Sequence, residues 1–110
     1  MEIDLLYFDD CPSWQSALAN LKIALTEEGL DAQQVRLVKI ENAEDANKMQ
    51  FLGSPSIHFD HVDLWPEERE EYLLGCRLYL TPDGLRGWPT VEMIRKKIVE
   101  NQAKSGSSLT

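Results

Sequence analysis

Cysteine is the residue whose chemistry is most specific in this chain, and Cys11 stands in a suggestive setting. It belongs to the stretch Asp-Cys-Pro-Ser-Trp, which follows the apolar run Ile-Asp-Leu-Leu-Tyr-Phe. Two thiols spaced Cys-x-x-Cys exchange disulfides because the second thiol attacks the mixed disulfide that the first has formed. Here Trp14 occupies the place of the second cysteine, and an indole ring cannot attack a disulfide. The stretch therefore predicts exchange chemistry at Cys11 that depends on a thiol from elsewhere.

The place of Cys11 relative to the following helix bears on its reactivity. Apolar residues recur at helical spacing from position 14 onward, and Pro12 suits the first helical position, so we expect Cys11 to be the N-cap. A sulfur at a helix N-terminus meets unpaired N–H groups and the positive end of the helix dipole, which favour the thiolate. Asp9 and Asp10 oppose ionisation of a neighbouring thiol. The alternative is that Cys11 is simply a small buried apolar residue.

The rest of the sequence predicts strands and helices that alternate along the chain. The expected strands are residues 3–8, 35–40, 56–59 and 76–80, with a turn at 81–84. The expected helices run from Cys11 to a stop at Gly29, from a cap at Asn42 through Leu52, and through Val91, Ile94, Ile98 and Val99. Residues 61–75 are acidic and irregular, with room for one or two helical turns after Pro66.

This order is typical of an α/β domain. Together with Cys-Pro-Ser-Trp opening the first helix and Gly-Ser-Pro-Ser-Ile at residues 53–57 opening the third strand, it resembles the thioredoxin-like family. The resemblance covers most of residues 2–102, with 61–75 as an insertion between the last two strands. It implies a thioredoxin-like α/β fold, in which a four-stranded mixed sheet is flanked by three helices. We expect one domain over residues 1–102 and a flexible tail over 103–110.

The resemblance also implies a site. In this family a cis-proline faces the active-site cysteine, and these roles carry over onto Pro55 and Cys11. The residues expected to bind substrate are Pro12, Ser13, Trp14, Ser54 and Pro55. Trp14 is most simply explained as an aromatic ring that packs in the first helical turn with Leu18, although it could also line the substrate groove.

Cys76 is the second cysteine of the chain. In the resembling fold, the third strand leads away from the cis-proline and the fourth returns, so Cys76 is expected at the far end. About five residues at roughly 3.3 Å each would leave roughly 15 Å between the sulfurs, beyond disulfide reach. We therefore expect Cys76 to be a buried structural thiol that forms no disulfide with Cys11. We also expect iodoacetamide to modify Cys11 faster than Cys76.

Composition restricts partners and location. The chain has 110 residues, of which 43% are hydrophobic and 27% charged, and a formal net charge of -8. That charge repels polyanions, so we expect no binding to nucleic acid. Because no apolar run reaches 18 residues and no basic-then-apolar signal begins the chain, we expect no membrane insertion and a cytoplasmic location. In that compartment two cysteines are expected to be free or catalytic rather than a structural disulfide.

A group of polar residues near the end of the third strand raises the question of a metal site. His58, Asp60, His61 and Asp63 lie close together in the sequence, but their spacing matches no metal-binding pattern. Neighbouring side chains of a strand also point to opposite faces. We therefore expect no metal and interpret these residues as solvated.

Two functions of different class remain. The first is a thiol–disulfide oxidoreductase acting through one cysteine, in which Cys11 attacks a disulfide and an external thiol such as glutathione resolves the product. Its substrate would be a thiol or disulfide, either glutathione or a protein, with glutathione as co-substrate and no other cofactor. The second is a non-catalytic thioredoxin-fold module that binds a peptide or protein, presenting unpaired backbone beside Pro55 to an extended peptide.

Overall fold

The computed structural model describes residues 2–69, 72 and 74–108, with side chains described as far as residue 102. The elements are, in chain order, β1 (Ile3–Tyr7), α1 (Trp14–Glu27), the 3-10 turn η1 (Ala32–Gln34), β2 (Val35–Lys39), α2 (Ala43–Lys48), β3 (Ser56–Phe59), β4 (Val62–Asp63), β5 (Tyr79–Thr81), β6 (Gly84–Arg86) and α3 (Val91–Ser108). The first three strands differ from the expected ranges by at most one residue.

The main sheet has four strands in the order β2-β1-β3-β4. β1 lies inside it, parallel to β2 and antiparallel to β3, and β4 pairs antiparallel with the other side of β3. The one charged residue of β1, Asp4, is buried and accepts two hydrogen bonds from Arg36 of β2, at 2.9 and 3.0 Å. The expectation of a mixed four-stranded sheet with three α-helices is confirmed for the described part of the chain.

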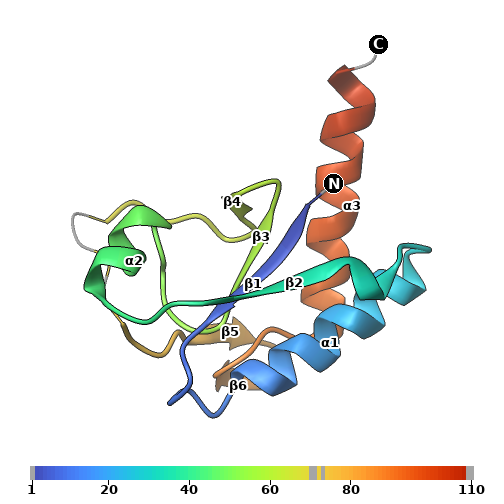
Figure 1. Ribbon diagram of the computed structural model, residues 1–110. Helices are drawn as coiled ribbons and strands as arrows, with labels where there is room; N and C mark the ends of the chain where they lie inside the picture. The colour runs from blue at the N-terminus through green and yellow to red at the C-terminus, as the bar shows by residue number, and fades with distance from the viewer. Residues whose placement is uncertain (1, 70–71, 73, 109–110) are drawn as a thin grey trace.

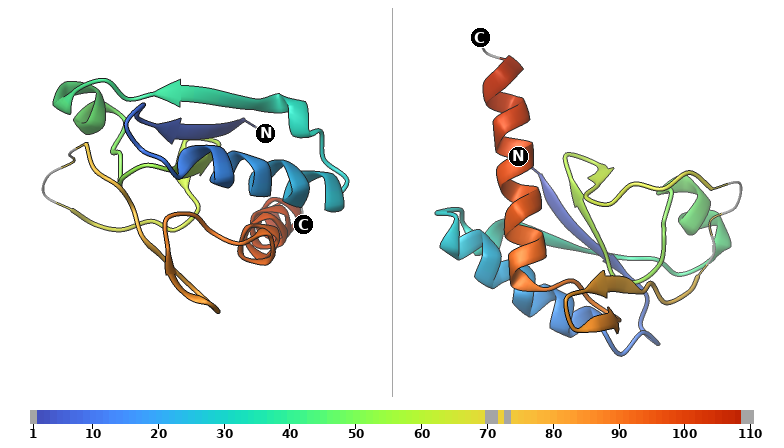
Figure 2. Two further views of the ribbon diagram at one scale, coloured as in Figure 1. Left: turned by 90° about the horizontal axis from the view of Figure 1, so that it is seen from below. Right: turned by 180° about the vertical axis from the view of Figure 1, so that it is seen from behind.

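Each face of the sheet has its own apolar core, because successive residues of a strand point to opposite faces. On one face Ile3, Leu5 and Ile57 pack against α1 and α3. On the other face Leu6 packs with Phe51 and with residues of α2. Figure 1 shows α1 and α3 next to each other and well apart from α2, and the left view of Figure 2 shows α3 nearly end-on beside α1. The loop that carries Cys11 leads from the central strand β1 into α1.

The fourth strand of the sheet is not the expected one. β4 lies inside residues 61–75, the segment expected to be an insertion. The chain reverses at Asp60 and His61, which both have positive φ angles, 52° and 70°. Two successive residues with positive φ make a tight hairpin turn whose twist suits the strands that it joins. The helical turns expected after Pro66 are absent from the described residues of this segment.

The strand expected at residues 76–80 was wrong in position and in partner. The chain becomes a strand only at Tyr79, and β5 pairs with β6 in a separate two-stranded sheet rather than joining the main one. The turn expected at residues 81–84 joins β5 to β6 and is confirmed. In the left view of Figure 2 this hairpin extends away from the sheet.

Helix α1 begins later than expected. Its N-cap is Ser13, so the prediction that Cys11 is the N-cap was wrong. The physical reason is a pair of turns between β1 and the helix. The amide of Cys11 donates to the backbone oxygen of Phe8 at 3.1 Å, and Pro12 and Ser13 form a second turn. The helix ends before Gly29, as expected, which has a φ angle of +77°.

The other two helices also differ from expectation at their C-terminal ends. The Asn42 side chain caps α2 as expected, accepting a hydrogen bond from the amide of Asp45 at 2.8 Å. The helix ends at Lys48 with Met49 as its C-cap, before Leu52, because Gln50 adopts a left-handed conformation with φ +50° and closes it.

Helix α3 continues to Ser108, into the segment 103–110 expected to be a flexible tail, whose last two residues lie outside the described part of the chain. Neither α3 nor any other helix of the described residues has the length and apolar character needed to cross a membrane.

Candidate functional site

The loop between β1 and α1 buries the Cys11 thiol against a second loop of the chain. Only 2% of Cys11 is exposed. Its Sγ donates a hydrogen bond to the backbone oxygen of Ser54 at 3.5 Å. The Ser54 hydroxyl in turn accepts a hydrogen bond from the amide of Phe8 at 3.3 Å. Two hydrogen bonds to Ser54 therefore hold the two loops together, one of them made by the thiol itself.

The second loop contains the expected cis bond, between Ser54 and Pro55. Both residues are buried, and the backbone oxygen of Pro55 accepts a hydrogen bond from the Tyr79 hydroxyl at 2.6 Å. The structure thus brings Cys11 and Ser54 together beside Pro55. It does not leave Ser54 or Pro55 open to a substrate.

Ser54 is covered by the chain's own segment around Cys76. The amide of Ser54 donates to the backbone oxygen of Gly75 at 2.8 Å, and the amide of Arg77 donates to the backbone oxygen of Ser54 at 2.9 Å. These two hydrogen bonds make Cys76 the parallel bridge partner of Ser54. Because bridge partners direct their side chains to the same side, Cys76 lies beside the loop that holds Cys11.

The expectation that roughly 15 Å separates the two sulfurs was therefore wrong. It assumed that Cys76 begins a strand antiparallel to β3 and lies at its far end. Since β4 fills that side of β3, the segment around Cys76 pairs instead with the loop that precedes β3. Cys76 is accordingly near the start of β3, where Ser54 and Pro55 also lie.

The two thiols differ in exposure and influence each other. Both are free, but Cys11 is buried whereas Cys76 is exposed, not buried as the sequence led us to expect. The pKa of Cys76 is raised above its ordinary value, first by partial desolvation and then by the adjacent Cys11 thiol. An effect of one thiol on the other requires that the side chains are neighbours.

Three further residues expected at the site lie at the start of α1. Pro12 is exposed, and Ser13 and Trp14 are partly buried. The Trp14 ring stacks on that of Tyr7, with centroids 4.3 Å apart and planes inclined by 28°. Trp14 and Leu18 each pack against the core on the α1 face of the sheet. These contacts support the packing interpretation of Trp14.

A mostly acidic hollow lies next to the segment that carries Cys76. A hollow of about 240 Å³ is lined by Phe8, Asp9, Asp10, Lys39, Ile40, Glu41 and Leu74. Asp9 forms an ion pair with Lys39, and this hydrogen-bonded contact raises the pKa of Lys39. Leu74 is two residues from Cys76, so the hollow adjoins the segment that carries the exposed thiol. Lys39 also lies 3.8 Å from the Glu41 carboxylate, and Asp10 adds a further acidic side chain to the lining.

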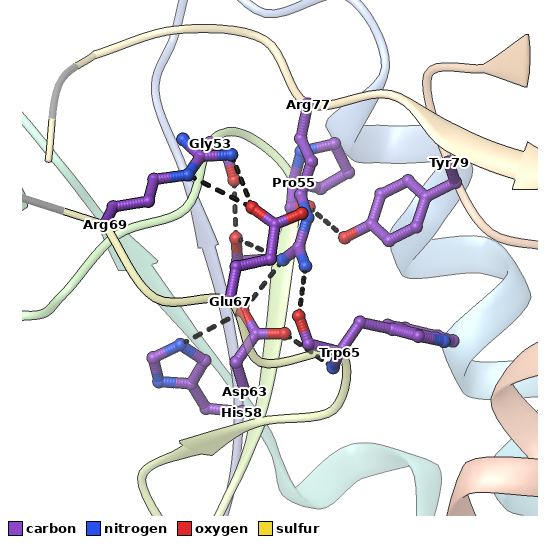
Figure 3. A network of polar contacts seen from close by, with 10 residues as sticks. Gly53, Pro55, His58, Asp63, Trp65, Glu67, Arg69, Arg77 and Tyr79 are labelled. Carbon is purple, nitrogen blue, oxygen red and sulfur yellow. Dashed lines mark hydrogen bonds and ion pairs between the residues drawn. The ribbon is translucent and has the colours of Figure 1, made fainter.

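Arg77 follows Cys76 directly in the chain, and Figure 3 shows the network of polar contacts that holds its side chain. Its buried guanidinium donates hydrogen bonds to the Asp63 carboxylate at 2.8 Å, the Ser56 hydroxyl at 3.1 Å and the backbone oxygen of Trp65 at 2.6 Å. The central carbon of the guanidinium also lies 4.9 Å from the centroid of the Tyr79 ring, in a cation–π contact. A buried polar network with this many partners favours one arrangement of the chain. The residue directly after Cys76 is thereby fixed in place.

Gly53 allows the segment around Cys76 to lie close to the loop that precedes β3. Its φ angle is +117°, a region that residues with a side chain rarely adopt. A Cβ atom at this position would lie only 2.9 Å from the Cβ of Arg77. Glycine is therefore required here both by backbone conformation and by the closeness of the two strands.

The polar residues near the end of β3 are not all solvated. His58 and Asp63 are buried, with exposed fractions of 4% and 9%, because β4 pairs with β3 and Arg77 covers them. His58 Nε2 lies 3.6 Å from the Asp63 carboxylate. Burial acts to raise the pKa of Asp63, but His58 and Arg77 outweigh it and the pKa is lowered. No group of three or more His, Cys, Asp and Glu side chains within the described residues is arranged to hold a metal ion.

Sequence reasoning missed Cys76, Arg77 and Gly53 as parts of one site. The available signal was Arg77 itself, a charged residue inside a mostly apolar stretch, which needs a carboxylate partner if it is buried. No family model, curated protein or solved structure matches the chain. The site is therefore interpreted from its geometry, which places a buried thiol close to an exposed one.

Proposed function

We propose that this protein is a thiol–disulfide oxidoreductase of the thioredoxin-like type, in which Cys11 forms and releases a disulfide bond during each turnover. The observation that carries the proposal is the position of Cys11, whose Sγ is held 3.5 Å from the backbone oxygen of Ser54, directly before Pro55. The order of the elements and the mixed sheet agree with the resemblance seen in the sequence.

The substrate is a disulfide, either a small one or one on a protein surface. A thiolate of the site attacks one of its sulfurs, and thiols from solution complete the reduction. Glutathione is a suitable co-substrate because a small thiol can reach a recessed sulfur. Since only 2% of Cys11 is exposed, a protein substrate meets this sulfur only after the covering segment has moved or after a more exposed group has reacted first.

The contacts at Ser54 favour this function over a non-catalytic peptide-binding module. Such a module would offer unpaired backbone beside Pro55 to an extended peptide. Here the amide and the backbone oxygen of Ser54 are already bonded to Gly75 and Arg77, and the backbone oxygen of Pro55 is bonded to the Tyr79 hydroxyl.

The test is the reduction of a small mixed disulfide of glutathione, with consumption of glutathione measured by a coupled assay. Cys11→Ser should reduce turnover by at least about tenfold, because its hydroxyl cannot form a disulfide. Cys11→Ala serves as a second replacement, and urea unfolding checks that both variants are folded. Folded variants that keep more than half of the wild-type turnover would contradict the proposed function.

A further inference from the structure

We propose, building on the function above, that Cys76 is the second catalytic thiol of the site. It attacks the substrate disulfide first, and Cys11 then resolves the product by forming an internal Cys11–Cys76 disulfide.

Ser54 is the residue that brings Cys76 and Cys11 together. The backbone oxygen of Ser54 accepts hydrogen bonds from Cys11 Sγ at 3.5 Å and from the amide of Arg77 at 2.9 Å. The same Ser54 is the bridge partner of Cys76. Paired segments lie about 4.8 Å apart, so Cys76 lies directly beside the residue whose backbone oxygen accepts the hydrogen bond of Cys11. Both thiols therefore lie next to Ser54, Cys11 through its hydrogen bond and Cys76 through the backbone pairing.

The difference in exposure assigns the order of attack. A thiolate must approach a disulfide along the axis of its S–S bond, so the attacking sulfur has to be open to solvent. Cys76 is exposed, whereas Cys11 is buried under the loop that contains it. A buried thiol beside the first one is well placed for the second step, because its target is already attached to the protein.

The segment that carries Cys76 is built to hold this position. Arg77 is fixed by Asp63, Ser56 and Trp65, and Gly53 has no side chain where Arg77 packs against it. None of these contacts involves either sulfur. The position of Cys76 near Cys11 is therefore set by contacts of its neighbours and does not depend on a bond between the two sulfurs.

The two steps balance in atoms and electrons. Cys76 loses its proton to solvent and attacks one sulfur of the substrate disulfide. The S–S bond of the substrate breaks. One half of the substrate is now bound to Cys76, and the other half leaves as a thiolate that takes up a proton. Cys11 then loses its proton and attacks the Cys76 sulfur, which releases the second half of the substrate as a thiol. The substrate gains two electrons and two protons, and the two cysteines become one disulfide. Two molecules of a small thiol such as glutathione return the pair to dithiol and are themselves oxidised to a disulfide.

Oxidised glutathione is the probe for this proposal. Oxidised glutathione is added to four proteins: the wild type, Cys11→Ser, Cys76→Ser and the control Leu78→Ser. Each reaction is quenched in acid, and the intact mass of the protein is measured by mass spectrometry under non-reducing conditions. Leu78 is an exposed neighbour of Cys76 in the same segment, so its replacement tests for unspecific effects. Turnover of each variant is measured in parallel with the coupled glutathione assay.

The wild type and Leu78→Ser should lose the mass of two hydrogen atoms and keep no glutathione. Cys11→Ser should keep one glutathione on Cys76 until a thiol is added, since no sulfur is left to displace it. Cys76→Ser should acquire glutathione on Cys11 at least about tenfold more slowly than Cys11→Ser acquires it on Cys76. Its turnover should be at least about tenfold below that of the wild type.

The two proposals can fail separately. If the wild type keeps glutathione on Cys11 and Cys76→Ser turns over like the wild type, Cys76 has no part in the reaction. The proposal made here is then overturned, while exchange at Cys11 alone stands. If the internal disulfide forms through Cys76 as described but Cys11→Ser keeps full turnover, the pairing stands and the proposed function is overturned.

Discussion

At the scale of single residues, the two cysteines divide the requirements of disulfide exchange between them. An attacking thiol needs access to solvent and a populated thiolate. Cys76 has the access, since it is exposed, but its pKa is raised by partial desolvation and by the Cys11 thiol. Cys11 is protected from solvent and hydrogen-bonded through its sulfur. The rate of the first step should therefore be governed by the ionisation of Cys76.

Alkylation with iodoacetamide tests this division. Cys76 should be modified faster than Cys11, the reverse of the order expected from the sequence, because the alkylating agent must reach the sulfur. Its rate should keep rising as pH increases through the ordinary range of thiol ionisation, because a raised pKa moves the titration to higher pH.

Replacing Cys11 with serine removes one cause of the raised pKa of Cys76. The pKa should then fall, the thiolate of Cys76 should be more populated near neutral pH, and its alkylation should be faster than in the wild type. The rates are obtained by peptide mass spectrometry at several pH values. An alkylation profile of Cys76 that is identical in the wild type and in Cys11→Ser would show that the thiols do not interact.

At the scale of elements, the site depends on how closely the segment around Cys76 approaches the loop before β3. Gly53 makes this approach possible. Gly53→Ala should destabilise the fold by about 1–2 kcal/mol through its positive φ angle alone. It should also push Arg77 away, since the new Cβ would lie 2.9 Å from that of Arg77, and so slow the formation of the internal disulfide.

Gly29→Ala is a matched control for this change. Gly29 also has a positive φ angle, +77°, but no atom lies within 4 Å of the place where its Cβ would be. Urea unfolding should therefore show a loss of stability in both variants, whereas slower disulfide formation should appear only in Gly53→Ala. Equal rates of disulfide formation in the two variants would show that the thiol pair does not depend on the packing at Gly53.

Local patterns were sufficient to predict much of the fold. The apolar run at β1, the helical spacing in α1 and the Asn42 cap are properties of neighbouring residues, and all are present in the structure. The pairing of Cys76 with Ser54 is not such a property. It depends on the reversal at residues 60–61, where two residues other than glycine adopt positive φ, and that turn has no strong sequence signal. Once β4 was missed, Cys76 was expected at the wrong end of β3.

At the scale of the whole molecule, charge should select among disulfide substrates. The chain carries a formal net charge of -8, and Asp9, Asp10 and Glu41 line the hollow beside the Cys76 segment together with one cation, Lys39. An anionic disulfide such as oxidised glutathione is repelled from such a surface, whereas a cationic one is attracted. The protein is therefore suited to neutral or positively charged disulfides, with glutathione at high concentration supplying the returning thiol.

Cystamine, a cationic disulfide, should accordingly react with the wild type faster than oxidised glutathione at low ionic strength. Added salt should slow the reaction of cystamine and speed that of glutathione, because the Debye length falls to about 10 Å at 0.1 M. The salt series is its own control, since the intrinsic reactivities of the two disulfides do not change in opposite directions when salt is added. Rates whose ratio is unchanged by salt would show that the surface charge does not act on the site.

The central claim is that Cys11 and Cys76 are neighbours that form one reversible disulfide within a single chain. The direct measurement is a peptide map of the monomer after treatment with oxidised glutathione, with free thiols blocked by N-ethylmaleimide and digestion by trypsin under non-reducing conditions. The sequence places Cys11 in the tryptic peptide 1–22 and Cys76 in the peptide 70–77. We predict that these two peptides are recovered mainly as one linked species that added thiol separates. Recovery of the two peptides apart, each blocked or carrying glutathione, would contradict the account.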